Sequence, residues 1–397
     1  MMAQKKLVPK RRFEGFTEEW EKQQLNSIFN RVRNAFVGTA TPYYVNYGNF
    51  YLQSNNVKNG NINRESEIFI NNEFYKKQED KLLRTGDLVM VQSGHVGHTA
   101  VIPEELDKTA AHALIMFQGY KKEANPYFYN YQFQTIKVKK RLSSVTTGNT
   151  IRHILASDMN FFEMNVTSIE EQQKIGQFFK HLDEMIALQQ RKIDKTKALK
   201  SAYLAEMFPV EGERVPKRRF AGFTEEWRSS KFENIINMHN NLRVPVTASK
   251  RITGDTPYYG ANGIQDYVKG STHDGEFVLI AEDGANDLTD YPVLYVNGEV
   301  WVNNHAHVVT GKTDIIDNLF LVSRMKSMDI SKWLVGGGRA KLNAEVLKNI
   351  QIKMTDFKEQ IKIGEFFKII DDSIINDEQK LEKLKATKQA YLHEMFV

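Results

Sequence analysis

One long helix-like segment occurs twice in this chain, and the duplication constrains the fold more than any other feature. Residues 168–208 and 356–396 align without a gap at an offset of 188 positions, which places Phe178-Phe179 on Phe366-Phe367. Neither copy contains proline. Each copy is therefore predicted to form a single helix of about 40 residues, long enough to span about 60 Å.

Apolar residues recur in both segments at alternating steps of four and three, which is typical of a coiled-coil seam. A long helix with a single apolar seam needs a partner, and the simplest partner is the other copy. Both seams are interrupted at matching positions, Gln189 with Asp377 and Lys200 with Lys388. The alternative is a pair of unrelated surface helices. The residues expected to pair the helices are Ile175, Phe179, Leu182, Ile186, Ile193, Tyr203, Ile363, Phe367, Ile370, Ile374, Leu381, Leu384 and Tyr391.

A second duplication precedes each half of the chain. The motif VPKRRF-x-GFTEEW begins at Val8 and again at Val215. The order of motif, variable block and long helix thus occurs twice, as in a pseudo-twofold molecule, and closing the chain into a circle would place the first motif after the last helix. Thr followed by two Glu residues suits a helix N-terminus. The KRR run could contact phosphate or be solvated.

Both variable blocks have the pattern of a mixed α/β domain. Strand-like runs separated by turn signals are predicted at 50–57, 87–92, 99–102 and 113–117, followed by a short helix at 125–134. The second block differs in sequence but repeats the plan. We therefore predict an α+β protein in which two mixed α/β domains are separated by two long antiparallel coiled-coil helices. The expected divisions are 1–167, 168–214, 215–354 and 355–397.

Composition excludes several classes of protein. The 397 residues contain no cysteine, which excludes a disulfide scaffold, a thiolate metal site and a thiol nucleophile. No signal peptide or membrane-spanning run is present, so a cytoplasmic location without a membrane partner is expected. The net charge of +5 is compatible with a nucleic-acid partner.

A search for catalytic motifs finds neither a phosphate-binding loop nor a dinucleotide fingerprint. The pairs His95 with His98 and His305 with His307 lack carboxylates at ligand spacing, so a metal site is the minority interpretation. Glu282-Asp283 follows a predicted strand, as metal-binding acids do in nucleases, but no lysine follows at the usual spacing. No catalytic residue and no metal ligand is predicted.

The duplicated sequence motif EQ-x-KIG-x-FF…AYL-x-EMF resembles the helical regions of specificity (S) subunits of Type I restriction–modification systems. Residues 51–60, 85–97 and 257–267 are similar to the target recognition domains of that family. The resemblance implies a non-catalytic subunit in which each domain reads one half of a split, asymmetric DNA site while the helices set the gap. It also implies two methyltransferase (M) subunits and restriction/translocase (R) subunits as partners. S-adenosylmethionine, ATP and Mg²⁺ would bind to those partners, and this chain would need no cofactor.

Two other functions stay open, a stand-alone DNA-modifying enzyme and a coiled-coil adaptor that does not bind DNA. If the chain does bind double-stranded DNA, polar residues in loops after strands are the candidates for contact. In the first block these are Asn46, Tyr47, Asn49, Gln92, Ser93, His95, His98, Asn149 and Arg152. In the second block they are Tyr259, Asn262, Gln265, Glu282, Asp283, Asn303, Asn304, His305, Arg339 and Lys341.

Overall fold

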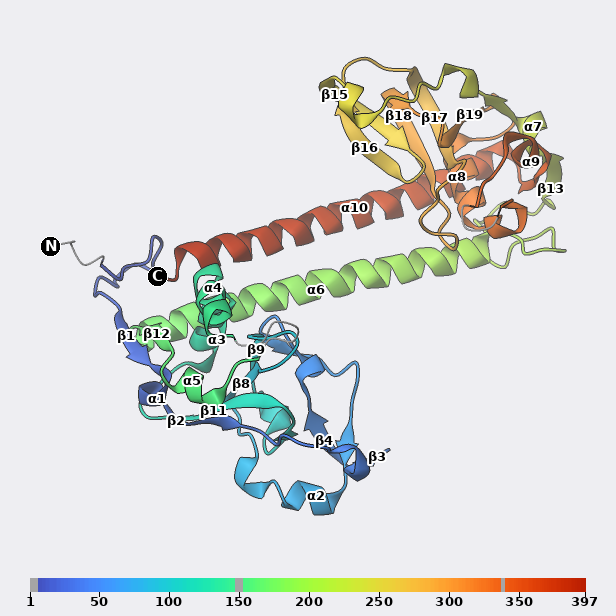
Figure 1. Cartoon of the computed structure of the whole chain (residues 1–397). Coiled ribbons are helices and arrows are strands. Elements are labelled where there is room, and N and C mark those ends of the chain that lie inside the picture. The colour runs from blue at the N-terminus through green and yellow to red at the C-terminus, as the bar shows by residue number, and fades with distance from the viewer. Residues whose placement is uncertain (1–5, 147–152, 337–339) are drawn as a thin grey trace. The chain divides into compact units, whose positions relative to one another are not determined.

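The computed structural model describes residues 6–146, 153–336 and 340–397, and the chain divides into two compact units (Figure 1). The first unit comprises Met1–Gln189 with Lys380–Val397, and the second comprises Gln190–Gln379. Both unit boundaries fall inside long helices, α6 (Ile169–Met207) and α10 (Phe357–Glu394). Each unit therefore contains part of both helices, and the two predicted long helices are confirmed.

Within each unit the two helices run antiparallel. In the first unit the beginning of α6 packs on the end of α10, where the rings of Phe179 and Phe396 lie 5.8 Å apart. In the second unit the end of α6 packs on the beginning of α10, where the rings of Phe208 and Phe367 also lie 5.8 Å apart. The same pair of repeat positions meets in both units, so each copy of the helix has the other copy as its partner.

The residues proposed to pair the helices lie on the inner faces to different degrees. Half-buried positions are Ile186, Tyr203, Leu384 and Tyr391. Buried positions are Ile175, Phe179, Leu182, Ile193, Ile363, Phe367, Ile370, Ile374 and Leu381.

The two lysines that interrupt the seams form matching ion pairs between the helices. Lys388 Nζ lies 2.6 Å from Asp183 Oδ1 in the first unit, and Lys200 Nζ lies 2.5 Å from Asp371 Oδ1 in the second. The first pair is the more buried, with side chains 9% and 17% exposed. Its carboxylate also accepts a hydrogen bond of 2.8 Å from the hydroxyl of Tyr131. A polar seam position is thus tolerated because a specific partner satisfies it.

The first unit contains a central four-stranded sheet and a smaller sheet beside it. The central sheet has the spatial order β2 (Phe29–Asn34), β11 (Leu114–Tyr120), β8 (Leu88–Val91) and β9 (Thr99–Val101). The smaller sheet has the order β10 (Ala110–Ala111), β4 (Asn49–Leu52), β7 (Phe69–Ile70) and β3 (Tyr44–Val45). The other described strands between the motif and α6 are the hairpin of β5 (Val57–Lys58) and β6 (Asn61–Ile62), together with the pair β1 and β12.

The helices of the first unit agree with the sequence pattern where capping residues are clear. The Asn125 side chain caps α3 (Pro126–Gln134) by accepting from Phe128 N, as the predicted helix requires. The predicted strand 50–57 is wrong beyond Leu52. There the buried Asn56 accepts from Gln53 N and donates to two carbonyls, which favours a turn over a strand. The other described helices are α1 (Leu25–Ile28), α2 (Asn72–Lys76), α4 (Ile136–Val145) and α5 (Ala156–Asn160).

The second unit contains one six-stranded sheet that curls on itself. The end of β18 pairs with the start of β17. Glu282, just after the end of β17, nevertheless donates its N–H to the carbonyl of His305, which lies only three residues after β18. The chain after β18 therefore reaches both ends of β17. Two paired glycines with positive φ, Gly275 (+128°) and Gly298 (+95°), supply the bend. The strands in spatial order are β14 (Ile236–Met238), β19 (Ala306–Gly311), β17 (His273–Ala281), β18 (Val293–Val302), β15 (Thr253–Gly260) and β16 (Gly263–Val268).

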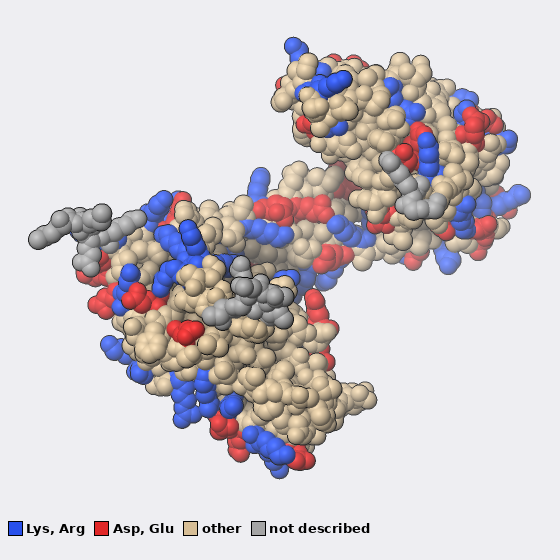
Figure 2. Space-filling model, viewed as in Figure 1, with Lys and Arg blue, Asp and Glu red and all other residues tan. Residues whose placement is uncertain are grey.

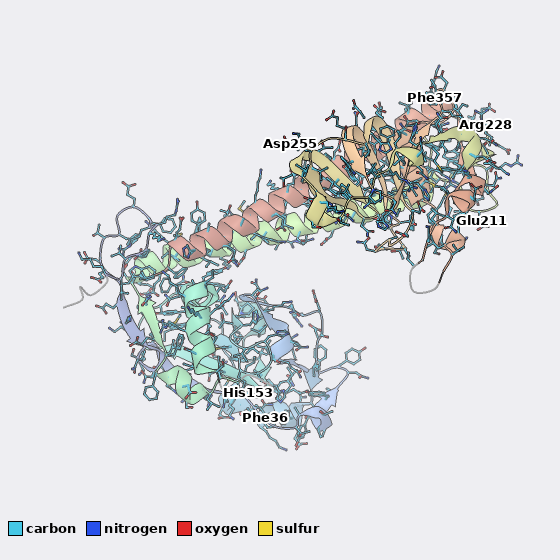
Figure 3. The ribbon with its side chains drawn as sticks, turned by 45° about the horizontal axis from the view of Figure 1, so that its top comes forward. Phe36, His153, Glu211, Arg228, Asp255 and Phe357 are labelled. Atoms are coloured by element: carbon cyan, nitrogen blue, oxygen red, sulfur yellow. The ribbon has the colours of Figure 1, made fainter. Side chains whose placement is uncertain are left out.

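Short antiparallel pairs hold the two ends of each variable block together. In the first unit β1 (Glu21–Gln24) pairs with β12 (Glu163–Val166), and in the second β13 (Arg228–Lys231) pairs with β20 (Gln351–Met354). Figure 3 shows Arg228 and the start of α10 at the same end of the second unit. The described helices of this unit also include α7 (Phe232–Ile235), α8 (Asn318–Lys326) and α9 (Ala344–Asn349). Each block is thus a closed domain that leads directly into a long helix.

The duplicated motif contains turns and bends but no helix, so the predicted helix start at its T-E-E-W segment is wrong. Instead, the motif folds against the first turn of a long helix. Arg12 binds Glu171 through two hydrogen bonds of 2.6 and 2.8 Å, and Arg219 binds Glu359 through two of 2.8 Å. Both carboxylates are completely buried. These arginines are therefore structural.

The first motif contacts the end of α10, as the circular order of the repeat predicts. Arg11 N donates to the carbonyl of Glu394, and its side chain pairs with that glutamate at 2.6 Å. Arg218 makes the same two contacts with Glu206, only twelve residues away in the chain. None of the helices in the described ranges combines the length and the hydropathy needed to span a bilayer.

We predict that Lys388→Met destabilises the first unit by about 3 kcal/mol, because it leaves Asp183 with a buried, unpaired charge. Lys200→Met is the matched control and should cost about 1 kcal/mol or less, since its partner Asp371 is 37% exposed. Native-state hydrogen exchange of amides in both ends of α10 measures the two effects separately. Equal losses of protection at the two ends would contradict the assigned difference in burial, and Asp183→Asn should restore part of the loss caused by Lys388→Met.

Candidate functional site

Several of the polar residues singled out in the second block converge where three chain segments meet. Glu282 and Asp283 directly follow β17, and His305 closes the turn between β18 and β19. Glu282 N donates to His305 O at 2.8 Å, and the His305 ring pairs with the Asp283 carboxylate. Asp283 also forms an isolated bridge with Lys341. Tertiary structure thus joins residues that are about 60 positions apart in sequence.

The turn between β15 and β16 borders the same cluster. Asn303 N donates to the carbonyl of Tyr259 at 3.1 Å, and Asn262 Nδ2 donates to the carbonyl of Gly284 at 2.8 Å. Tyr259 is half-buried and Asn303 is buried. The side chains exposed to solvent are those of Asn262, Gln265 and Asn304. These amides offer both donors and acceptors, the chemistry that distinguishes base edges.

Two cationic side chains contact Glu282 in this cluster. Arg243 Nη1 donates to Glu282 Oε2 at 2.7 Å and to the carbonyl of Ala306 at 2.9 Å, and Lys341 Nζ lies 3.0 Å from Glu282 Oε1. Burial opposes the charge of Glu282, but the bonds from Arg243 and Lys341 outweigh it and hold its pKa below the usual value. Arg243 was missed in the sequence because no motif surrounds it. Its contacts indicate that it positions the turn.

The histidine pair at 305 and 307 is split between two environments. His307 is completely buried, with Nε2 2.7 Å from the carbonyl of Leu342 and Nδ1 2.9 Å from Asn240 Nδ2. Burial lowers its pKa, so the ring is neutral at pH 7. Among the described residues, no group of three or more His, Asp or Glu side chains is placed to hold a metal ion.

The first unit presents an equivalent turn between β8 and β9. Ser93 forms an isolated bridge with His153, just as Asp283 does with Lys341 in the second unit. His95 is exposed, whereas His98 is half-buried and accepts a hydrogen bond from Asn59 N at 3.1 Å through Nδ1. Gln92, also half-buried, accepts from Ile154 N through its carbonyl. Three candidates, Asn149, Arg152 and Arg339, lie outside the described residues.

The remaining candidates of the first unit form a separate group in the smaller sheet. Asn46 and Tyr47 are exposed in the turn between β3 and β4, where Tyr47 is 91% exposed. Asn49 is half-buried and donates to Asn72 Oδ1 at 2.8 Å. Figure 1 shows β3 and β4 at the side of the unit away from α4 and α6. Two regions of the first unit, rather than one, therefore carry the predicted residues.

The long helices do not present a uniformly basic surface. On the face shown in Figure 2, acidic and basic side chains are interspersed along them. Exposed aliphatic side chains also lie on these helices, namely Leu188, Leu199, Ile369 and Ile375. A mixed surface of this kind suits contact with protein better than contact with the DNA backbone.

Comparison with solved structures reveals the same fold. A specificity subunit of a Type I restriction–modification system from M. genitalium matches with a TM-score of 0.72 at 15% identity, covering 98% of this chain and 99% of that one. A chain from a structure that concerns complex assembly and conformational transition of the type I restriction–modification system matches with a TM-score of 0.51 at 16% identity, covering 95% of this chain and 97% of that one.

Curated proteins resemble parts of the sequence more closely. A putative type I restriction enzyme specificity subunit of Haemophilus influenzae is 44% identical over 38% of this chain, and the match spans 37% of that protein. A type I restriction enzyme specificity subunit of Escherichia coli is 28% identical over 33% of this chain and 31% of that protein. One of Methanocaldococcus jannaschii is 20% identical over 66% of this chain and 68% of that protein.

The model of one protein family matches both halves of the chain, over residues 17–198 and 224–386. These two ranges contain both variable blocks and most of both long helices. The chain therefore belongs to the Type I restriction modification DNA specificity domain family.

Proposed function

We propose that this chain is the DNA sequence-recognition subunit of a Type I restriction–modification complex. The observation that carries the proposal is the pair of equivalent turns, built on Ser93 with His153 and on Asp283 with Lys341. The same type of backbone bridge occurs in both units, but the side chains displayed on the turns differ. Two domains that display different side chains at equivalent turns suit a split site whose halves differ in sequence.

The parts of the chain take distinct roles in this proposal. Residues 1–167 and 215–354 form the two target recognition domains, while 168–214 and 355–397 set the gap between half-sites and dock two methyltransferase subunits. The exposed amides Asn262, Gln265 and Asn304 contact base edges in the second half-site. Asn46, Tyr47, Gln92 and Ser93 do so in the first.

The chain itself supplies recognition rather than chemistry in this proposal. Methyl transfer, DNA cleavage and translocation belong to the partner subunits, which bind S-adenosylmethionine, ATP and Mg²⁺. Incubating the pure chain with DNA, Mg²⁺ and S-adenosylmethionine tests this division. Methylation or cleavage by the chain alone would favour a stand-alone enzyme.

Footprinting the chain with its methyltransferase partner tests DNA recognition directly. We expect two protected clusters separated by a short gap. Gln265→Ala should weaken binding about 10-fold, since loss of one base contact costs roughly 1–3 kcal/mol, and should relax preference in one half-site only. Gln351→Ala, an equally exposed glutamine on β20, should leave affinity unchanged. A single undivided footprint, or equal losses for the two variants, would count against this assignment.

The role of the helices in spacing is tested by lengthening both of them. Inserting four residues after Gln189 in α6, together with four after Gln379 in α10, adds about 6 Å to each helix. Because base pairs are about 3.4 Å apart, the required gap should grow by about two base pairs while both half-site sequences stay the same. Sequencing of methylated adenines on a library of sites measures both properties. An unchanged gap, or changed half-sites, would show that the helices do not set the spacing.

A further inference from the structure

The first unit contains an open groove. It lies between the β8–β9 turn and α4, with a volume of about 400 Å³. Its polar lining comes from His95, His98, Lys139, Ser143 and Thr146. No carboxylate lines it among the residues that the structure describes. A groove that combines ammonium, imidazole and hydroxyl groups without an acid favours an anion.

Helix α4 supplies an excess of positive charge at this groove. Its sequence, IKVKKRLSSV, contains four cations and no acid. Two of these have structural contacts, since Arg141 donates to the carbonyl of Glu163 at 2.6 Å and Lys137 donates to that of Phe396 at 3.5 Å. Lys139 and Lys140 are exposed and form no ion pair within the described ranges. Burial and the charge of Lys388 lower the pKa of Lys139, and an anion bound in the groove would oppose this shift by favouring the charged form.

His98 is oriented to donate a hydrogen bond. Its Nδ1 accepts from Asn59 N, so the proton of the neutral ring lies on Nε2. Burial lowers the pKa of His98, and the charges of Lys139, His95 and Lys58 lower it further. Lys139 and Lys58, which disfavour protonation of His98, would attract a negatively charged group.

Two lysines in the corresponding segment of the second unit are paired with carboxylates. Lys326 at the end of α8 pairs with Asp290 at 2.7 Å, and Lys332 pairs with Glu211 at 3.0 Å (Figure 3 labels Glu211). The chain there forms a 3-10 turn, Ile330–Trp333, instead of a helix like α4. These two lysines of the second unit are therefore paired, whereas Lys139 beside the groove of the first unit is not, within the described residues.

We propose that this groove binds the phosphodiester backbone of the half-site read by the first unit. Lys139, which lines the groove, and Lys140, its exposed neighbour on α4, are the charged contacts. The proposal rests on the proposed function, because the same β8–β9 turn carries Gln92 and Ser93 as base-reading candidates. Gly94, whose absent Cβ would meet nothing within 4 Å, leaves the turn open to close approach by the DNA strand. His95 and His98 are thereby assigned to phosphate rather than to bases.

The salt dependence of DNA binding tests this inference. The full chain, assembled with its methyltransferase partner, is titrated with duplexes at several salt concentrations. In Lys139→Gln the slope of log affinity against log salt should become shallower by about 1, and in Lys139→Gln/Lys140→Gln by about 2, since each phosphate contact contributes roughly 0.9. The loss should be equal on the recognised site and on a duplex with an altered first half. Lys139→Arg should keep the wild-type slope.

Two control variants remove exposed lysines that already have acidic partners. Lys77→Gln on α2, paired with Glu73, and Lys332→Gln in the second unit should both leave the slope unchanged. An unchanged slope in Lys139→Gln/Lys140→Gln, or a loss confined to duplexes with an intact first half, would overturn the phosphate assignment. Failure of the wild-type assembly to prefer any split site would instead refute the proposed function.

Discussion

A buried carboxylate in the first turn of each long helix is the contact on which each unit depends. Glu171 and Glu359 are completely buried, so each needs a full set of donors. Arginine from the motif supplies two of these, and a threonine just before the helix supplies another. Removing one partner of such a buried pair costs about 3–5 kcal/mol. The pair ties the segment before the variable block to the helix after it, and so closes the domain.

The same closure explains how blocks of different sequence fit on one scaffold. Each block enters and leaves through an antiparallel strand pair, β1 with β12 or β13 with β20. A helix capped by Asn125 or Asp317 then packs against the long helix, and in both units a glutamine of that helix, Gln172 or Gln360, accepts a backbone N–H from the capping residue. These contacts use repeated residues. The turns that display Ser93 or Asp283 are free to differ, and recognition can differ with them.

Charge is distributed differently in the two units despite the shared plan. In the second unit Lys326, Lys332 and Lys341 each pair with a carboxylate. In the first, Lys139 and Lys140 stand beside a groove without an acid among the described residues. Pairing stabilises a turn, whereas an unpaired cation raises affinity for a polyanion. Among the described residues, these lysines are therefore paired in the second unit and unpaired beside the groove of the first.

Periodicity and capping chemistry in the sequence were enough to predict α6, α10, α3 and the internal repeat, because these depend on neighbouring residues. The division into two mixed α/β domains followed from the repeat, and the family resemblance added the expectation that each domain reads DNA. Local chemistry misplaced the T-E-E-W segment, which looks like a helix start but forms no helix, because the motif instead packs against the long helix through Arg12 and Glu171. The curl of the second sheet, the role of Arg243 and the groove beside Lys139 arise from contacts between distant segments. Only the tertiary structure decided them, because residues far away in the chain determine whether each polar group has a partner.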